Sequence, residues 1–155
     1  MFPMVKPIPD DYPRISVYLC VDGAAEAIDF YTGVLGLTES RRMTFAGRIG
    51  HCELRLGDSL VMLSDEWPEM GVVGPKTLGG TPVSMAVNVE DCDAIFAAAL
   101  EAGATELSPV EDQFYGDRMG QFLDPWGHKW SVHTHIEDVD DAELDRRAAA
   151  MMGEG

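Results

Sequence analysis

The strongest pattern along the chain is an alternation of apolar and polar residues directly after a Pro-Trp-Gly turn at 125–127. In the run Lys129–His135, tryptophan, valine and threonine occupy the even-numbered positions, and Ser131 and His133 are among the polar residues at the odd-numbered ones. Because the side chains of a strand alternate between its two faces, this run predicts a half-buried strand. One face is expected in the core, and the role of the polar face is the functional question.

Similar runs of β-branched and alternating residues, separated by Gly, Pro and Asp, predict eight strands in all. They cover residues 14–21, 37–44, 48–56, 59–64, 82–89, 105–109, 113–123 and 129–135. Apolar residues at helical spacing predict one helix between a cap at Asp22 and a stop at Gly36, and another between Asp91 and Gly103. A third helix is predicted over 142–152.

The order of these elements repeats. A strand–helix junction occurs at Val21-Asp22 and again at Val89-Glu90, 68 residues later, and three strands follow each helix. The chain therefore predicts an α+β fold of two tandem βαβββ modules and a C-terminal helix. The predicted parts are an extended N-terminal arm (1–13), the first module (14–64), a linker or lid loop (65–81), the second module (82–135), and a C-terminal helix with its tail (136–155).

Charge and composition narrow the range of partners. Eleven basic and 27 acidic residues give a formal net charge of −16, which would repel the phosphate backbone of nucleic acid. The acidity either serves solubility or attracts a cationic ligand. Three cysteines without paired spacing predict reduced, buried side chains. No apolar run reaches membrane-spanning length and the start shows no signal-peptide pattern, so we expect a cytoplasmic protein without a membrane partner.

Two motifs carry a resemblance to a known family: Phe-Tyr-x-x-Val-Leu-Gly at 30–36 and Asp-Pro-x-Gly-His at 124–128. With the duplicated βαβββ unit they resemble the vicinal oxygen chelate superfamily, which includes glyoxalases, bleomycin-resistance proteins and dioxygenases. The pattern is most similar to its PhnB-like, glyoxalase-like branch. The resemblance implies that the mixed sheets of the two modules curl into a cup around a ligand, and that the protein forms a homodimer.

In metal-dependent members of this family, His or Glu residues reach into the cup from the first and last strand of each module. The matching positions here hold Ser16, Met62, Ser84 and Ser131. Zinc, nickel and iron sites require imidazole, carboxylate or thiolate ligands, which hydroxyl and thioether groups do not replace. We therefore expect no metal and no other cofactor, and a cup that is open to an organic ligand. The alternative is that these small side chains simply fit a crowded barrel.

Three further polar residues could act at the site. His133 shares a strand face with Ser131 and can serve as an acid–base group or a hydrogen-bonding wall. His51 and Glu53 share a face of the strand predicted at 48–56, and this face is directed either to the cup or to solvent. The candidates for catalysis are His133 and Glu53.

Aromatic and basic residues in the predicted loops complete the set. Tyr115 and Arg118 can clamp a planar or anionic ligand, or belong to a turn with a surface ion pair. Trp67, in the loop at 65–81, can close over a ligand or pack as an ordinary loop residue. The predicted ligand-binding residues are Ser16, Tyr18, His51, Met62, Ser84, Tyr115, Arg118, Ser131 and His133.

These expectations favour a metal-independent small-molecule-binding protein of the glyoxalase/bleomycin-resistance type that sequesters an aromatic or cationic ligand. The alternative is a lyase, isomerase or dioxygenase of the same superfamily, with a displaced metal site or a metal-free acid–base site. A structural or regulatory domain with a filled cup is the third possibility. The sequence leaves open whether the protein is an enzyme, because a fold does not specify a function.

Overall fold

The computed structural model of the chain describes residues 4–153. The first three residues of the predicted arm and the last two of the predicted tail lie outside this range. The chain divides into two units, Met1–Gly80 and Thr81–Gly155. Each unit has its own four-stranded sheet and its own helices.

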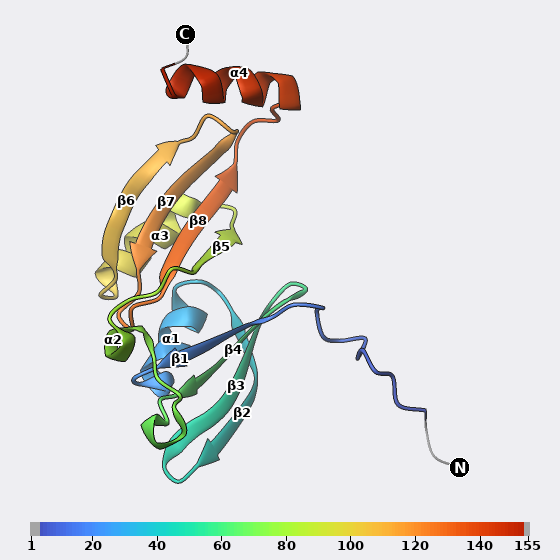
Figure 1. The fold of residues 1–155 in the computed structure, drawn as a ribbon, viewed down its shortest axis with the longest axis vertical. Helices are drawn as coiled ribbons and strands as arrows, with labels where there is room; N and C mark the ends of the chain where they lie inside the picture. The colour runs from blue at the N-terminus through green and yellow to red at the C-terminus, as the bar shows by residue number, and fades with distance from the viewer. Residues whose placement is uncertain (1–3, 154–155) are drawn as a thin grey trace. The chain divides into compact units, whose positions relative to one another are not determined.

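The first unit contains a long helix and a four-stranded mixed sheet (Figure 1). Its elements are β1 (Val17–Val21), α1 (Ala24–Gly33), β2 (Thr38–Phe45), β3 (Arg48–Leu56) and β4 (Ser59–Asp65). The strand order is β1-β4-β3-β2, in which β1 runs parallel to β4 and the other neighbours are antiparallel. The topology is that of a βαβββ module, as the sequence pattern predicts.

The core of the first unit lies between α1 and one face of the sheet. Leu19 and Val21 of β1 are buried on this face, as is Leu63 of β4, and the helix buries Ile28 and Tyr31. The opposite face of β1 carries Tyr18 and Cys20, which stay partly exposed. The alternation predicted for this strand is therefore confirmed, and the face turned away from α1 is the one available to a ligand.

The N-terminus of α1 is held by an aspartate that the sequence pattern does not identify. Asp22 does not cap this helix, since the N-cap residue is Gly23, at φ 128°, and no side chain caps it from that position. Asp65 at the end of β4 accepts a hydrogen bond from the backbone N–H of Ala24 (2.8 Å) and another from that of Ile49 (2.7 Å). A residue 41 positions away thus performs the role that proximity in sequence assigned to Asp22.

The segment that follows β4 folds back on its own unit. It contains a short 3₁₀ helix, η1 (Pro68–Met70), and a single helical turn, α2 (Pro75–Leu78). Glu66 fixes it by accepting hydrogen bonds from Gly74 N–H (2.7 Å) and the Thr77 hydroxyl (2.6 Å). A Cβ atom at Gly74 would lie 2.7 Å from the carbonyl oxygen of Cys20, so this approach to β1 requires glycine.

The second unit repeats the topology of the first. Its elements are β5 (Ser84–Asn88), α3 (Cys92–Glu101), β6 (Thr105–Asp112), β7 (Asp117–Leu123) and β8 (Lys129–His135), followed by α4 (Asp141–Met151). The strand order β5-β8-β7-β6, with β5 parallel to β8, matches β1-β4-β3-β2 element by element. The protein is thus α+β with two βαβββ modules and a C-terminal helix, as predicted, and neither sheet is closed.

The core of the second unit explains the alternation along β8. Trp130 and Val132 are buried, as are Phe122 of β7 and Phe96 of α3. Asp91 caps α3 as predicted, accepting from Ala94 N–H (3.1 Å). A second hydrogen bond, accepted by Thr134, also holds the start of that helix.

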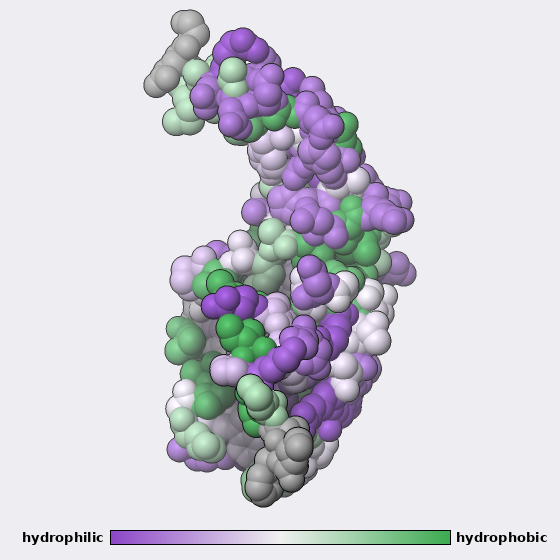
Figure 2. All heavy atoms as spheres, turned by 90° about the vertical axis from the view of Figure 1, so that its right-hand side faces the viewer, coloured by the Kyte–Doolittle hydropathy of each residue, from purple (hydrophilic) through white to green (hydrophobic). Residues whose placement is uncertain are grey.

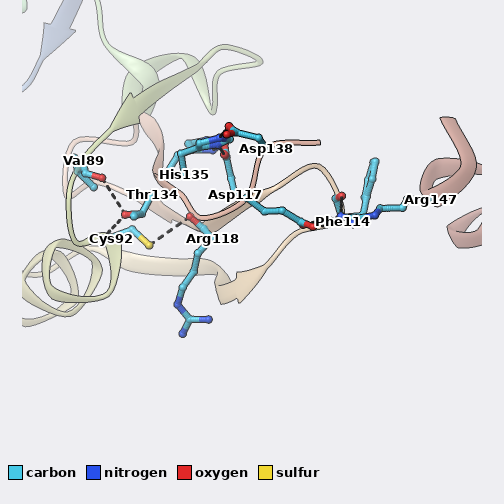
Figure 3. Close-up of polar contacts among 11 residues, drawn as sticks. Val89, Cys92, Phe114, Asp117, Arg118, Thr134, His135, Asp138 and Arg147 are labelled. Atoms are coloured by element: carbon cyan, nitrogen blue, oxygen red, sulfur yellow. Dashed lines mark hydrogen bonds and ion pairs between the residues drawn. The ribbon is translucent and has the colours of Figure 1, made fainter. Parts of the chain in front are cut away.

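Thr134 on β8 joins the helix start to the end of β5. Its hydroxyl accepts from Cys92 N–H (2.9 Å) and donates to the carbonyl oxygen of Val89 (3.0 Å), and Figure 3 shows it between the two. The face of β8 that carries Trp130 and Val132 is therefore fixed by apolar packing and by these hydrogen bonds.

The turn before β8 is fixed by Asp124, the first residue of its motif. One carboxylate oxygen accepts from Trp126 N–H (2.9 Å) and His128 N–H (3.0 Å), and the other accepts from the indole N–H of Trp130 (2.9 Å). The carboxylate is buried, and these charge-assisted bonds offset the cost of removing it from water. The Asp-Pro-x-Gly-His motif at 124–128 therefore has a structural role, in which Asp124 fixes the turn.

Helix α4 begins with a capping hydrogen bond from Glu143 N–H to the Asp140 side chain (2.8 Å) and buries no residue. Arg147 ties it to its own unit through two contacts with Glu137 (2.8 and 2.9 Å) and one with the carbonyl oxygen of Phe114 (2.9 Å). Figure 2 shows it as mainly hydrophilic. Among the helices described over residues 4–153, none has the length and apolar character required to cross a bilayer.

Candidate functional site

A pocket of about 510 Å³ opens on the first unit. It lies on the sheet face that is turned away from α1. Two of its lining residues, Tyr18 and Ser64, lie on this face, since Ser64 is the register partner of Cys20, which shares a face of β1 with Tyr18. The lining comes from the four strands of the unit and the segment after β4. It consists of Tyr18, Phe45, Gly50, Ser64, Trp67, Met70 and Val72.

The wall of this pocket is mainly aromatic and apolar. The rings of Phe45 and Trp67 have centroids 6.0 Å apart, tilted by 42°. Phe45 is 70% exposed and Tyr18 49% exposed, which is unusual for such large side chains. Figure 2 shows apolar side chains gathered on part of the surface of this unit. Apolar side chains grouped around a concavity with a few polar groups are typical of a ligand site.

Trp67 already has a cation over its ring. The guanidinium carbon of Arg48 lies 4.4 Å from the ring centroid. Arg48 also forms an ion pair with Glu69 (3.1 Å) and donates to the carbonyl oxygen of Glu66 (3.2 Å). These contacts hold the indole in position at the pocket.

A chain of polar groups runs from the pocket into β3. The hydroxyl of Tyr18 is 2.8 Å from Nδ1 of His51, and Nε2 of His51 is 2.9 Å from Oε2 of Glu53. On its other side the Glu53 carboxylate accepts from the hydroxyl of Tyr12 at 2.9 and 3.1 Å. Glu53 is only 5% exposed, so this buried carboxylate depends on the hydrogen bonds it receives.

The shifted pKa values of the groups in this polar chain follow from their contacts. The hydrogen bond from His51, foremost, and that from Tyr12 hold the pKa of Glu53 below its ordinary value, so Glu53 is a carboxylate at neutral pH. Burial raises the pKa of Tyr18, and its phenol therefore stays neutral. The bond to Glu53 likewise raises the pKa of Tyr12. The group in contact with the pocket is thus an uncharged hydroxyl.

The end of the predicted arm is part of this arrangement. Arg55, next to Glu53 on the same face of β3, donates to the carbonyl oxygen of Asp11 (2.7 Å). Its guanidinium carbon lies 5.1 Å from the centroid of the Tyr12 ring. The last residues of the arm are therefore fixed against β3, and they seal Glu53 from solvent.

The four positions matched to the family's metal ligands are divided between the units. Ser16 is half-buried just before β1, and Met62 lies on β4 as the register partner of both Tyr18 and Glu53. Ser84 is exposed at the start of β5, and Ser131 is buried on β8. Their hydroxyl and thioether groups are unsuitable donors for a divalent ion. Over residues 4–153, moreover, no three His, Cys, Asp or Glu side chains come together as metal ligands.

The second unit holds a different polar chain. Oγ of Ser131 is 2.9 Å from Nε2 of His133, whose Nδ1 is 3.3 Å from the carboxylate of Asp117. Asp117 also contacts Nδ1 of His135 (2.9 Å), and Nε2 of His135 contacts Asp138 (2.7 Å), as Figure 3 shows in part. The two carboxylates, Asp117 foremost, raise the pKa of His135.

Asp117 is a residue that the sequence pattern does not single out. It lies 14 to 18 residues before the three β8 residues of the chain, and only the β7–β8 register, in which Asp117 is opposite His135, brings it among them. That Ser131 and His133 lie side by side could be predicted, because residues i and i+2 share one face of a strand. The available signal was a carboxylate within the neighbouring predicted strand at 113–123.

Tyr115 and Arg118 are already engaged within the second unit. The Arg118 guanidinium binds Asp93 through Nε (2.7 Å) and Nη2 (2.9 Å), and Asp112 through Nη1 (3.0 Å). The bonds to Asp93, followed by that to Asp112, raise the pKa of this guanidinium. Tyr115 is half-buried and packs edge-to-face on Phe114, with centroids 5.4 Å apart. These contacts are those of the surface ion pair that the sequence left as the alternative.

Comparison with known proteins agrees with this architecture. Residues 14–132 match the model of the Glyoxalase/Bleomycin resistance protein/Dioxygenase superfamily. An uncharacterized protein of Mycobacterium bovis is 42% identical over 147 residues, which cover 92% of this chain and 95% of that protein. A protein of Mycobacterium tuberculosis is similar at the same identity, with 85% of its length covered.

Solved structures give the same picture. A protein from Pseudomonas aeruginosa is 25% identical with a TM-score of 0.67, over 81% of this chain and 99% of the other. TioX from Micromonospora sp. ML1 is 28% identical with a TM-score of 0.62, over 80% and 99%. The PhnB protein from Bacillus cereus shares the fold at 18% identity, with a TM-score of 0.64 over 79% and 99%. The chain belongs to the Glyoxalase/Bleomycin resistance protein/Dioxygenase superfamily.

Proposed function

We propose that this protein is a metal-independent binding protein that sequesters a small aromatic or cationic molecule, with the pocket of the first unit as its site. The observation that carries the proposal is the pocket of about 510 Å³ with Tyr18, Phe45 and Trp67 in its wall. A volume of this size suits a small organic molecule. The donor chemistry at the family's metal positions supports a role without a metal.

Of the two ligand classes, the contacts favour an aromatic one. A cationic ligand would gain from the negative charge of the chain and from the ring faces. However, Arg48 already lies over Trp67, and a second cation at that ring would meet a positive charge at short range. A neutral, flat molecule can instead pack against Phe45 and Trp67 without this repulsion.

The polar residues near the pocket support binding over catalysis. The Glu53 carboxylate accepts from Tyr12 and His51, and these bonds keep its pKa low. Such a carboxylate is a poor proton acceptor from a substrate. Its contacts are those of a group that orients His51 and Tyr18.

The test measures the melting temperature and the intrinsic tryptophan fluorescence while a flat aromatic probe, 2-naphthol, is titrated into the protein. A ligand that binds only the folded state raises the melting temperature. We expect saturable stabilisation in the wild type, and a loss of at least tenfold in affinity in Trp67→Ala and Phe45→Ala. The matched control is Leu107→Ala, which truncates another partly exposed apolar side chain in the second unit and should bind normally. Equal binding by all four proteins would rule out this pocket as the site.

The homodimer and the cytoplasmic location remain predictions that rest on the family resemblance and on composition. Sedimentation equilibrium of the full chain tests the first. A monomer at micromolar concentration would contradict it.

A further inference from the structure

The pocket of the first unit has two side-chain hydroxyls, those of Tyr18 and Ser64, in an otherwise apolar wall. A hydroxyl can donate one hydrogen bond and accept others, so its contact with a ligand depends on where its hydrogen points. For Ser64 the structure gives an acceptor beside it, the carbonyl oxygen of the next residue. Its hydroxyl donates to the carbonyl oxygen of Asp65 (3.0 Å), which leaves lone pairs for the pocket.

The direction of the Tyr18 hydrogen follows from the polar chain behind it. Glu53 is a carboxylate and only accepts, so the hydrogen on Nε2 of His51 must lie between these two residues. With that hydrogen on Nε2, the other ring nitrogen, Nδ1, is the acceptor of the ring and faces the Tyr18 hydroxyl. Tyr18 donates to this nitrogen at 2.8 Å. The oxygen of Tyr18 therefore also offers only lone pairs to the pocket.

We infer that the pocket selects flat aromatic molecules that carry an O–H or N–H group, because both of its hydroxyls are set as hydrogen-bond acceptors. This inference rests on the proposed function and specifies its ligand class. Among the lining residues, the remaining side-chain donor is the indole N–H of Trp67. His51 and Glu53 act as positioning residues, since they fix the direction of the Tyr18 hydrogen without lining the pocket.

A pair of probes separates this inference from simple apolar binding. 2-Naphthol and 2-methoxynaphthalene share one ring system and are both neutral at neutral pH, but only the first can donate a hydrogen bond. A hydrogen bond in a partly desolvated site changes affinity by roughly tenfold. We therefore expect 2-naphthol to bind the wild type about tenfold more tightly than 2-methoxynaphthalene, measured by quenching of tryptophan fluorescence.

Variants of the two hydroxyls and of His51 test the assignment. Tyr18→Phe should lower the preference for 2-naphthol several-fold, and Tyr18→Phe combined with Ser64→Ala should abolish it. His51→Ala keeps the Tyr18 hydroxyl but removes the nearer of its two acceptors, since the carbonyl oxygen of Gly50 lies at 3.5 Å, and the hydrogen can then be donated to the methoxy oxygen. This variant should bind 2-methoxynaphthalene more tightly than the wild type does, an effect that a merely structural role of His51 would not produce. Unchanged binding of 2-methoxynaphthalene by Tyr18→Phe shows that the pocket of that variant is folded.

The possible results are distinct. If both probes bind the wild type equally, the pocket binds aromatic molecules but this inference is wrong. If 2-naphthol is preferred and the preference survives in the double variant, the acceptors are not Tyr18 and Ser64, and the inference is again wrong. If neither probe binds, the proposed function fails and the inference fails with it.

Discussion

In each unit one face of the sheet is turned away from the helix, α1 or α3. These two faces carry different side chains although the two units share one topology. Tyr18 of β1 and Ala86 of β5 are 68 residues apart, the spacing of the repeat. Tyr18 is the register partner of Met62, and Ala86 that of Ser131. Two bulky residues in one unit thus correspond to two small ones in the other.

This difference shows how a duplicated fold divides its roles. In the first unit, bulky aromatic and apolar side chains surround a pocket, and one buried carboxylate orients the groups behind it. In the second unit, imidazoles and carboxylates satisfy one another along β7 and β8, from Ser131 to Asp138. The cores under both sheets are apolar, so the two units share one topology although the side chains on their outer faces differ.

The largest expected effect is a loss of stability when the core that supports the sheet of the second unit is disrupted. Trp130→Ala removes a side chain that is 1% exposed and leaves the buried carboxylate of Asp124 without one of its donors. We expect the free energy of unfolding to fall by about 4 kcal/mol, measured by urea denaturation. Leu107→Ala, at a position 46% exposed, should change it by less than about 0.5 kcal/mol. A loss below about 1 kcal/mol in Trp130→Ala would contradict this account of the second core.

A smaller effect is expected from the buried carboxylate of the first unit. Glu53→Gln keeps the shape of the side chain but removes the charge that His51 and Tyr12 bind, and it should lower the stability by roughly 1–2 kcal/mol at neutral pH. The folded-state pKa of Glu53 lies below its ordinary value, so its contribution is present above that value and is lost as the pH falls through the lower one. The difference in stability between wild type and variant should therefore shrink in acid.

Tyr12→Phe is the matched variant for this carboxylate, because it removes one donor and leaves the charge and His51 in place. It should lower the stability by part of the amount that Glu53→Gln does. If both variants equal the wild type at neutral and acid pH, the polar chain does not stabilise the first unit.

The smallest effect is expected at the exposed end of the polar chain in the second unit. His135 is largely exposed and lies between Asp117 and Asp138, which raise its pKa. Any stability it contributes is fully present below the ordinary histidine pKa of about 6.5 and is lost as the pH rises through its higher value in the folded protein. An NMR titration of the imidazole protons should give a pKa above about 6.5 that returns toward it in Asp117→Asn. A wild-type value at or below the ordinary one would show that these contacts do not form in solution.

Local patterns along the sequence predict the fold well. The bounds of β3 and β8, the cap at Asp91 and the two modules follow from period-two alternation, turn residues and the 68-residue repeat. The other strands differ from the prediction by one to four residues at an end; β1, for example, begins at Val17 instead of residue 14, and β7 begins at Asp117 instead of residue 113. In the second case Gly116 turns the chain with φ 99°, directly before the strand.

Contacts between distant residues were much harder to predict. The hydrogen bond that holds the start of α1 is accepted by Asp65, and Asp117 joins the histidines of β8 only through the sheet register. Phe45 lies after a register shift in β2, and Met70 and Val72 lie in the segment after β4, whose path the sequence does not specify. The face that would hold a ligand could be predicted, but most of the pocket's apolar wall could not.

The most direct test of the pocket is to map where 2-naphthol binds on the isotopically labelled full chain by NMR. The account predicts that saturable chemical-shift changes centre on the amides of Tyr18, Gly50 and Val72 and on the indole N–H of Trp67. The amides of Ser131 and His133, on the corresponding face of the second unit, should change little. Changes centred on Ser131 and His133, or none at any concentration reached, would contradict it.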